Sequence, residues 1–379
     1  MKGDVKGMVR NVKAKRIEIY NNSSNKYSLS KIRQLTGCDY IMNGGIFTFG
    51  SLKPLCHLKV DGKVIAKDQY KYWGYAFNNG DNTLTMTNDY STYDNYICCS
   101  VMIRNGKKEK MIYNSDMGGK RGRTAIGTKK DGSLVLFCSK DGTSDAKTPE
   151  NLQTYMLNQG CVDAIVLDGG GSSQCNFNGS VISSTRIVSN LILVWSDRTF
   201  IPSGTEISST IKSGTKGSGA KWAQSIIQRI GYRIAVNGSF GSASVSALKH
   251  FQTYWGLEVD GKCGPASKKA LKDCVNAIES SSSKALRVAT KELGECESRR
   301  EDDKYISWYN AATGSKFAMN VSWCAIFVSW ALRRGGYSEK TYPNFASCSA
   351  GLTTFKKNGV LKSKSYKPKA GDLIFFDFN

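Results

Sequence analysis

The hydrophobic pattern changes character twice along the chain, so three segments are expected. Up to about residue 198, short apolar runs rich in β-branched residues alternate with clusters of Asn, Asp and Gly, the pattern of strands joined by turns. The clearest runs are Arg16–Tyr20, Leu134–Cys138 and Leu191–Trp195. We expect an α+β domain with a mixed sheet over residues 1–198.

One helix stands out within this first segment. Between Thr148, a good N-cap, and Gly160, a typical helix stop, apolar and long side chains recur at helical spacing. The apolar run 162–167 that follows predicts a buried strand. Asp168 therefore falls at the carboxyl end of a strand, where sites are often built.

The middle segment contains an internal repeat. Residues 236–249 recur 23 positions later as residues 259–272, each copy with an Asn-Gly or Asp-Gly turn, a second glycine and the sequence Ala-Leu-Lys. A further helix is expected at Trp222–Ile230. The result is a small three-helix domain without a cluster of catalytic residue types, which indicates a binding function.

The third segment combines helices with a closing strand. Helical patterns begin at Lys284 and at Trp323, and an apolar strand is expected from Leu373, after a Gly-Asp turn. This is the pattern of another α+β domain.

Two breaker-rich stretches divide the chain. Small polar residues at 199–210 and a serine run within 277–284 predict linkers. The expected domains are residues 1–198, 211–276 and 285–379.

Composition adds a strong positive charge to this picture. The chain has 53 Lys and Arg against 31 Asp and Glu, a formal net charge of +22. The excess is spread over both halves, whereas nucleic-acid-binding proteins usually concentrate it in a stripe. We therefore expect an extended anionic polymer as partner and no nucleic acid, with solubility alone as the plainer alternative.

Other protein classes are disfavoured by what the sequence lacks. No segment approaches the ~18 apolar residues of a membrane-spanning helix, and the N-terminus has no apolar stretch of a secretory signal. The 12 cysteines include no Cys-x-x-Cys pattern, which argues against zinc ribbons and thioredoxin-type motifs. Most cysteines are expected to be buried thiols, with a disulfide framework as the alternative.

Four stretches of the first segment are specific when taken together. They are Asn43–Phe47, Arg123–Gly127 followed by Asp131–Phe137, Asp141–Thr143 before Thr148–Leu152, and Asp163–Ser173. In this order they resemble the phosphodiester glycosidase family, whose members include an enzyme that removes N-acetylglucosamine from a sugar-1-phosphodiester. The resemblance spans nearly all of residues 1–198 and implies a hydrolase acting on glycosyl phosphodiesters. Taken singly, each stretch is also typical of an ordinary turn or surface cation.

The chemistry of that reaction suits the residues. Loss of a phosphodiester from an anomeric carbon passes through an oxocarbenium-like state, and the leaving phosphate is already a stable anion. The site needs a guanidinium fork for the phosphate, for which Arg123 is the candidate. It also needs a carboxylate near the anomeric carbon, as nucleophile, base or ion stabiliser. Asp168 is the candidate, with Asp141 as its competitor.

The remaining candidates surround these residues. Glycines allow backbone amides to approach oxyanions, and Asn and Ser side chains can bond sugar hydroxyls or phosphate oxygens. Asn43 is counted with the catalytic residues, and the substrate-binding candidates are Gly44, Gly45, Thr124, Gly169, Gly170, Gly171, Ser172 and Ser173. No cofactor is expected, although a divalent metal bridging the acidic groups stays open. His57 is expected to be a structural or surface residue rather than a catalyst.

The middle segment resembles the peptidoglycan-binding domain found on many cell-wall hydrolases. The resemblance covers residues 211–275 and includes the stretch 251–261. It implies docking on the glycan or stem peptide in a groove beside Asp260, with Trp255 as a candidate contact. Phe251 is expected in the core, and a core position is an equal alternative for Trp255.

The third segment is similar to the CHAP family of cysteine- and histidine-dependent amidohydrolases and peptidases. The matching stretches are Glu292–Gly294, Lys304–Tyr309, Trp323–Trp330 and Pro368–Phe376. Cys324, at a helix start, is the expected nucleophile because helix amides favour a thiolate.

The family's histidine base is missing from this segment. In the family it lies on the strand after the Gly-Asp turn, and the sequence reaches Asn379 before it. His57 and His250 belong to the other segments. We therefore expect an incomplete catalytic domain without amidase activity of its own.

Together the resemblances predict a modular cell-wall hydrolase of the phage endolysin or autolysin type. Its expected partners are peptidoglycan and anionic wall polymers, without membrane insertion. It would be made without a signal peptide and act on the wall after release, or be carried on a phage particle. The expected substrate is the N-acetylglucosamine-1-phosphate linkage of wall teichoic acid or a related glycosyl phosphodiester. The alternatives are a non-catalytic wall-binding or virion-associated protein with a degenerate glycosidase fold, and an enzyme that cuts a plain glycosidic bond.

Overall fold

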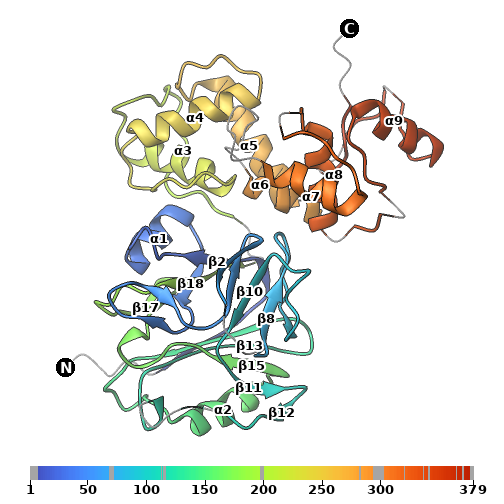
Figure 1. Ribbon diagram of the computed structural model, residues 1–379. Coiled ribbons are helices and arrows are strands. Elements are labelled where there is room, and N and C mark those ends of the chain that lie inside the picture. The colour runs from blue at the N-terminus through green and yellow to red at the C-terminus, as the bar shows by residue number, and fades with distance from the viewer. Residues whose placement is uncertain are drawn as a thin grey trace. The chain divides into compact units, whose positions relative to one another are not determined.

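A computed structural model gives the fold of the chain (Figure 1). It describes residues 7–67, 72–111, 113, 117–196, 200–280, 283–292, 303–319, 321–335, 337–339, 342–363, 365–368 and 371–375. The chain divides into two compact units, Met1–Arg198 and Thr199–Asn379, each with its own hydrophobic clusters. Over the described ranges, no helix combines the length and the apolar character needed to cross a membrane.

The first unit is built mainly from strands. Their bounds are Met8–Val12 (β1), Ala14–Asn21 (β2), Tyr40–Asn43 (β3), Phe47–Thr48 (β4), Lys53–Pro54 (β5), Leu58–Val60 (β6), Lys63–Ala66 (β7), Gly74–Phe77 (β8), Thr85–Thr87 (β9), Asn95–Cys98 (β10), Ser100–Arg104 (β11), Lys107–Lys108 (β12), Arg123–Thr128 (β13), Leu134–Ser139 (β14), Asp163–Val166 (β15), Cys175–Phe177 (β16), Ser180–Ile182 (β17) and Asn190–Ser196 (β18). A six-stranded sheet has the order β1-β14-β13-β15-β11-β12. Two five-stranded sheets have the orders β7-β6-β10-β8-β9 and β17-β16-β3-β18-β2, and β4 pairs with β5 alone.

Between the described residues every strand pair is antiparallel, so the expected mixed sheet is wrong. Helix α2 (Pro149–Asn158) carries the chain from β14 to β15, which run parallel to each other. They are not neighbours, because β13 lies between them and pairs antiparallel with both. The three strands that the sequence predicts most clearly are confirmed as β2, β14 and β18.

The expected helix after Thr148 is confirmed as α2. Thr148 Oγ1 accepts a hydrogen bond of 3.2 Å from the backbone N–H of Asn151, as an N-cap should. Pro149 begins the helix, where its missing N–H leaves no bond unmade. Gly160 follows the helix with a φ of +84°, a conformation that glycine adopts without strain.

Burial on both faces explains why the central strands are continuous apolar runs. In β14, Leu134 and Leu136 enter the large core between the sheets. Val135 and Phe137, on the opposite face, pack in the cluster beneath α2. Strand β18 alternates in the same way between the large core and a cluster beneath helix α1 (Leu29–Thr36) (Figure 1). The period of 2 along each strand thus assigns its residues to layers.

The expected small three-helix domain is confirmed as α3 (Ser218–Arg229), α4 (Ser242–Tyr254) and α5 (Pro265–Ser280) around a shared core. Each copy of the repeat is organised by a buried glutamine. Gln224 donates through Nε2 to Asn237 Oδ1, Ser239 O and Ser244 Oγ, and accepts from Gly238 N–H. Gln252 makes the matching contacts with Asp260 Oδ1, Lys262 O, Ser267 Oγ and Gly261 N–H. Each turn is therefore satisfied by the helix that precedes it.

Much of the expected linker 199–210 packs onto this helical domain instead. Lys268, only 5% exposed, donates to the carbonyls of Ile207, Ser208 and Ser209 at 2.6, 3.2 and 2.8 Å. Ile207 also lies against Gly219, where an added Cβ would come within 2.4 Å of Ile207 Cδ1. A buried ammonium thus satisfies the backbone of a stretch whose sequence forms no regular element.

The second expected linker, residues 277–284, is largely helical where it is described. Helix α5 continues to Ser280, and helix α6 (Lys284–Lys291) begins at the last residue of that stretch. Residues 281–282 lie outside the described residues.

The third segment contains α6, α7 (Asp303–Thr313), α8 (Cys324–Arg334) and α9 (Cys348–Lys357). The helices expected from Lys284 and Trp323 are confirmed as α6 and α8. Residues 293–294 and 376, which belong to the stretches quoted for the CHAP resemblance, lie outside the described residues, as do residues 377–379. The expected strand is wrong over residues 373–375, which pack against Phe345 and Phe355 without strand pairing. A strand needs a neighbour for its backbone groups, and the described part of this segment offers no strand to pair with.

Removing the Lys268 ammonium is expected to release the segment 203–209. Lys268→Ala leaves three backbone carbonyls without their donor and should lower the free energy of unfolding by about 1–3 kcal/mol. Lys269→Ala, on the same helix, removes only an exposed pair with Asp273 and should cost about 0.5 kcal/mol or less. Hydrogen exchange by mass spectrometry should show faster exchange of 203–209 in the first variant only. Equal exchange in both variants would contradict the packing role of Lys268.

Candidate functional site

The candidate residues of the first unit meet at one edge of the six-stranded sheet. Pairing of Arg123 with Ser139 and of Ala125 with Val166 brings the start of β13 beside the ends of β14 and β15. Pairing of Ser100 with Val166 adds the start of β11 to the same edge. Asp141 and Asp168, which follow β14 and β15, therefore lie on either side of the start of β13.

Asn43 joins this edge to a second sheet. It ends β3, and its side chain is fully buried. Its Nδ2 donates to the carbonyl of Asp168 at 2.8 Å. Its Oδ1 accepts from Thr124 Oγ1 at 2.7 Å and from Gln174 N–H at 3.1 Å. The Asn43 amide and the Thr124 hydroxyl therefore hydrogen-bond within the protein and hold the backbone of the site in place.

The glycines after Asn43 have a packing reason. Asp168 N–H donates to the carbonyl of Gly44 at 3.0 Å, and Gly45 N–H donates to Asn190 Oδ1 at 2.8 Å. A Cβ on Gly44 would lie 1.9 Å from Asn190 Oδ1, so no other residue fits there. Gly44 and Gly45 let the strand end approach the Asp168 turn closely.

Asp168 is half-buried at the start of a tight turn that continues into the 3-10 turn Gly170–Ser172. Its Oδ1 accepts from Gly169 N–H at 2.9 Å. Burial raises the pKa of Asp168 above its usual value. Hydrogen bonds from Ser172 and Gly169, together with the positive charge of Arg186, act in the opposite direction and limit that rise.

Arg123 is buried, and most of its guanidinium hydrogen bonds go to backbone carbonyls. Its Nε donates to Lys147 O at 2.9 Å, and its Nη2 donates to Met117 O at 2.8 Å and Gly119 O at 2.9 Å. Burial lowers the pKa of Arg123 from its usual value. Nη1 lies on the side of Gly169, 3.6 Å from where a Cβ of that residue would stand. In this arrangement the guanidinium holds the 117–119 loop beside the site.

Asp141 also braces the edge. Its Oδ1 accepts from Gly122 N–H at 2.6 Å. Gly122 in turn accepts from Gly170 N–H at 2.8 Å, which links Asp141 to the Asp168 turn through one residue. An added Cβ on Gly170 would come within 3.8 Å of Asp141 Oδ2, so the two acidic residues face the same turn.

Arg186 is a site residue that the sequence did not indicate. Its Nη1 donates to Ser172 Oγ at 3.0 Å, and its guanidinium carbon lies 4.3 Å from the centre of the Phe49 ring. Phe49 is 62% exposed, and Ser172 is fully buried. Among the described residues the Arg186 guanidinium makes only that one hydrogen bond, so most of its donors remain for a ligand. In the sequence it is one cation among 53, with no motif around it.

The remaining first-unit candidates have simpler surroundings. Gly171 is exposed, and an added Cβ there would meet Arg186 Nη2 at 3.1 Å. Ser173 is buried, and no hydrogen bond reaches its hydroxyl from the described residues. His57 is buried against Tyr90 and Tyr96, in keeping with a structural role. In the described ranges, no group of three or more His, Cys, Asp or Glu side chains could hold a metal ion.

In the helical domain, Phe251 is in the core as expected, and Trp255 is stacked on it with 44% of its surface exposed. Asp260 is occupied within its turn, where Oδ1 accepts from Lys262 N–H at 2.8 Å and from Gln252. These hydrogen bonds lower the pKa of Asp260. Trp255 is therefore the better placed of the two for an outside partner.

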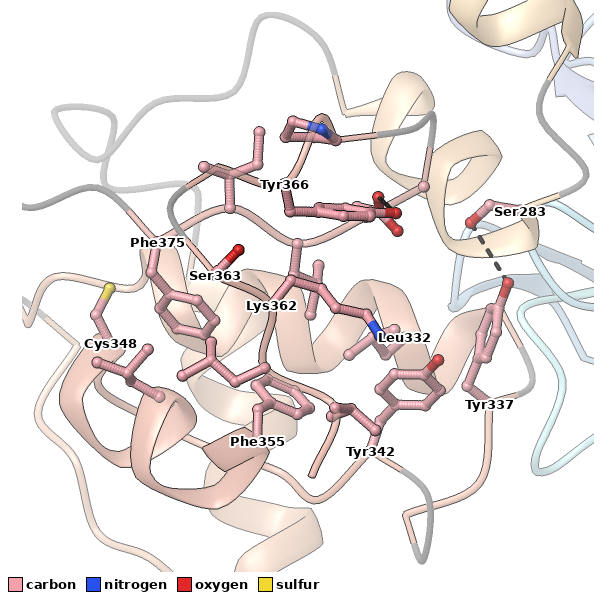
Figure 2. A pocket seen from close by; sticks show the side chains of 18 of the residues that line it. Ser283, Leu332, Tyr337, Tyr342, Cys348, Phe355, Lys362, Ser363, Tyr366 and Phe375 are labelled. Carbon is pink, nitrogen blue, oxygen red and sulfur yellow. Dashed lines mark hydrogen bonds between the residues drawn. The ribbon is translucent and has the colours of Figure 1, made fainter. Parts of the chain in front are cut away.

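In the third segment, Cys324 is exposed as the first residue of α8. His250 lies in α4 and pairs through Nδ1 with the Tyr232 hydroxyl at 2.7 Å. A separate cavity of about 1060 Å³ is lined by residues from Ser283 to Phe375. Figure 2 shows Tyr342, Phe355 and Phe375 around it. Cys324 does not line this cavity, and neither do the first-unit candidates.

Comparison with known families identifies two of the domains. Residues 36–195 match the family model described as phosphodiester glycosidase, and residues 216–271 match a putative peptidoglycan binding domain. The chain thus carries a phosphodiester glycosidase domain and a peptidoglycan-binding domain. The first match includes Asn43, Arg123, Asp141 and Asp168, and the second includes Trp255 and Asp260.

Individual relatives are more distant. The SPbeta prophage-derived uncharacterized protein YomE of Bacillus subtilis (strain 168) is 38% identical over 73 residues, 18% of this chain and 11% of that protein. The catalytic domain of zebrafish N-acetylglucosamine-1-phosphodiester alpha-N-acetylglucosaminidase, auto-inhibited by its pro-peptide, is 16% identical with a TM-score of 0.41, covering 52% of this chain and 85% of that one. A peptidoglycan-binding protein from Clostridioides difficile is 18% identical with a TM-score of 0.17, covering 40% and 92%.

The burial of Asp168 in the phosphodiester glycosidase domain predicts a stability cost at neutral pH. A folded-state pKa above the unfolded one means that the carboxyl favours folding below the unfolded pKa and loses that contribution as the pH rises through the folded pKa. Asp168→Asn should therefore raise the free energy of unfolding at about pH 7 by roughly 0.5–2 kcal/mol. The gain should vanish near pH 3, where both side chains are neutral.

The control is Asp131→Asn, in a turn at the opposite end of β13 and β14. Hydrogen bonds from Ser133 lower the pKa of Asp131, so this carboxylate favours folding above its unfolded pKa. The control should lose stability at neutral pH. Denaturant unfolding at both pH values measures the difference, and a less stable Asp168→Asn at pH 7 would contradict the prediction.

Proposed function

We propose that the phosphodiester glycosidase domain hydrolyses a sugar-1-phosphodiester bond in an anionic wall polymer and that the peptidoglycan-binding domain brings it to that polymer. The presence of both domains in one chain supports a cell-wall-associated glycosidase-like protein. The net charge of +22 favours attraction to a polyanion. The proposed substrate is the N-acetylglucosamine-1-phosphate linkage of wall teichoic acid, which combines both chemical features.

The observation that carries the proposal is the contact chain from Arg186 through Ser172 to Asp168. Arg186 Nη1 bonds Ser172 Oγ at 3.0 Å, and the Ser172 side chain lies near enough to Asp168 to lower the pKa of its carboxyl. The Asp168 carboxylate, after β15, and the Arg186 guanidinium, between β17 and β18, thus lie on either side of Ser172. A glycosyl phosphodiester presents an anomeric carbon and a phosphate as neighbouring groups, which suits a carboxylate and a guanidinium near each other.

In the proposed reaction, Asp168 faces the anomeric carbon and Arg186 binds the departing phosphate. The phosphate leaves as a stable anion, so the guanidinium needs only to balance its charge. Asp168 stabilises the oxocarbenium-like state or activates the attacking group at that carbon. Arg123 Nη1 and the N–H of the exposed Gly171 are the proposed further phosphate contacts, because the N–H groups of Gly169 and Gly170 already donate within the turn.

The other candidates take positioning roles in this proposal. Asp141 and Asn43 fix the two sides of the Asp168 turn through Gly122 and through the Asp168 carbonyl. Gly44, Gly45 and Thr124 complete that frame, and Ser173 lies buried beside it.

Trp255 is the proposed contact of the binding domain with the wall, with its turn shaped by Asp260. The prophage relative fits a released wall-acting protein or a phage-associated one. For the third segment we propose the CHAP-type assignment, with the exposed thiol of Cys324 as its nucleophile. The two histidines of the sequence, His57 and His250, lie in the other two segments.

Purified Gram-positive walls and an aryl phosphodiester of N-acetylglucosamine test the catalytic proposal. The wild-type protein should release phosphate-bearing polymer and turn over the aryl substrate. Asp168→Asn and Arg186→Gln should each lower kcat/KM by about 10²–10³-fold, because each removes a charge that acts in the transition state.

The matched control is Arg104→Gln. Its guanidinium carbon also lies over an aromatic ring, 4.5 Å from the centre of Trp73, but it is at the far end of β11 from the site. Its activity should stay within about twofold of the wild type. Wall binding without turnover would favour the non-catalytic alternative. Products cut at a plain glycosidic bond, seen by mass spectrometry, would favour the other one.

A further inference from the structure

A pair of cysteines faces each other beside the candidate site. In the ladder between β6 and β10, Tyr96 pairs with Lys59 and Ile97 with Leu58. Cys98 N–H continues the ladder by donating to His57 O at 3.3 Å. Continued by one residue, into the bends that flank the two strands, this register would bring Cys99 opposite Cys56.

The type of this cross-strand position favours close side chains. Because Cys98 and His57 form the hydrogen-bonded pair, Cys99 and Cys56 fall at the non-hydrogen-bonded position that follows. Cα atoms at such positions are about 4.5 Å apart, which lies within the range of roughly 4.4–6.8 Å found in disulfides. The backbone therefore needs little movement for a bond between the two sulfurs.

The side chains agree with the backbone. The Cys56 side chain lies close enough to Cys99 to raise the pKa of the Cys99 thiol, together with burial. Both residues are thiols and both are half-buried, so a small reagent can reach them. Cys56 and Asp168 are also close enough to act on each other, because a charge on Cys56 raises the pKa of Asp168.

A second thiol pair provides an internal comparison. Cys138 of β14 and Cys175 of β16 are also close, since Cys175 raises the pKa of Cys138, but both are fully buried in the core between the sheets. Cys324 and Cys348 are exposed. Among the described residues there are thus one half-buried pair beside the site, one inaccessible pair, two exposed single thiols and a further half-buried single thiol, Cys274.

Cys56 also ends a segment that reaches the substrate side of the site. The hairpin of β4 and β5 carries Phe49 and closes through Leu55 N–H to Ile46 O at 2.9 Å. Phe49 stacks against Arg186 at 4.3 Å. A bond from Cys56 to Cys99 would therefore fasten the 46–56 segment to the start of β11, next to Asp168.

We propose that Cys56 and Cys99 form a disulfide by exchange with a small external disulfide and that this bond fixes the Phe49 hairpin at the site. One thiolate attacks the external disulfide, forms a mixed disulfide and releases one external thiol. The other cysteine loses its proton and attacks the mixed disulfide, which releases the second external thiol. Two protein S–H bonds and one external S–S bond become one protein S–S bond and two external S–H bonds. The external disulfide takes up the two electrons.

The experiment treats the full chain with oxidised glutathione and maps the linked peptides by mass spectrometry. We expect a Cys56–Cys99 link, no link between Cys138 and Cys175, and mixed disulfides at Cys324 and Cys348. Oxidation should raise the midpoint of thermal unfolding by about 5 °C and slow hydrogen exchange over residues 46–56.

Single variants sharpen the test. In Cys56→Ser and Cys99→Ser the remaining cysteine should stop at the mixed disulfide with glutathione, and the thermal shift should be lost. Cys348→Ser is the control and should keep both the link and the shift. Modified Cys324 and Cys348 with unchanged Cys56 and Cys99 would overturn the proposal, as would a link from either to another cysteine.

The expected effect of the disulfide on activity rests on the proposed function. It is measured as KM, separately from the peptide mapping and thermal unfolding that report on the disulfide itself. Oxidation should lower KM for the aryl phosphodiester about two- to fivefold, because Phe49 and Arg186 are held in place before substrate arrives. If the link forms and stabilises the hairpin but no substrate is turned over, the proposed function fails and the disulfide stands. An unchanged KM with the link formed would overturn its proposed effect on the site.

Discussion

The first unit depends on one buried amide, that of Asn43, which joins two sheets at the point where the candidate chemistry lies. Its donors and acceptors face a carbonyl, a hydroxyl and a backbone N–H contributed by three separate stretches of chain. Because the side chain is fully buried, water cannot replace a lost partner. The hydrogen bonds that hold the Asp168 turn in place are therefore already formed before any substrate binds.

The two arginines near that frame show how burial separates roles that the sequence leaves equal. The Arg123 guanidinium donates hydrogen bonds to the carbonyls of Lys147, Met117 and Gly119, so it stabilises the 117–119 loop. Arg186 makes a single side-chain bond within the described residues and rests on an exposed ring. A guanidinium satisfied by backbone is a structural brace, whereas one held at a single corner stays available to an anion.

The sequence predicted the layers better than the contacts. Alternation in β14 and β18, the Thr148 cap and the repeated Asn-Gly and Asp-Gly turns are local signals, and the corresponding elements are present. The insertion of β13 between β14 and β15 is a long-range pairing that no local pattern encodes. The same holds for Lys268, whose buried ammonium makes a packed segment out of a stretch with linker composition. Arg186 was missed because one cation among 53 carries no spacing of its own.

The paired glutamines of the helical domain have a consequence for how that domain is assembled. Helix α4 supplies Ser244 to the turn organised by Gln224 and supplies Gln252 to the next turn. The two halves of the domain thus follow each other along the chain and share helix α4. A fragment that ends before Ser244 would lose members of both polar centres at once, because it would lack both Ser244 and Gln252. A third repeat could be added to the domain in the same way. Its helix would supply a hydroxyl to the preceding turn and a glutamine to the following turn.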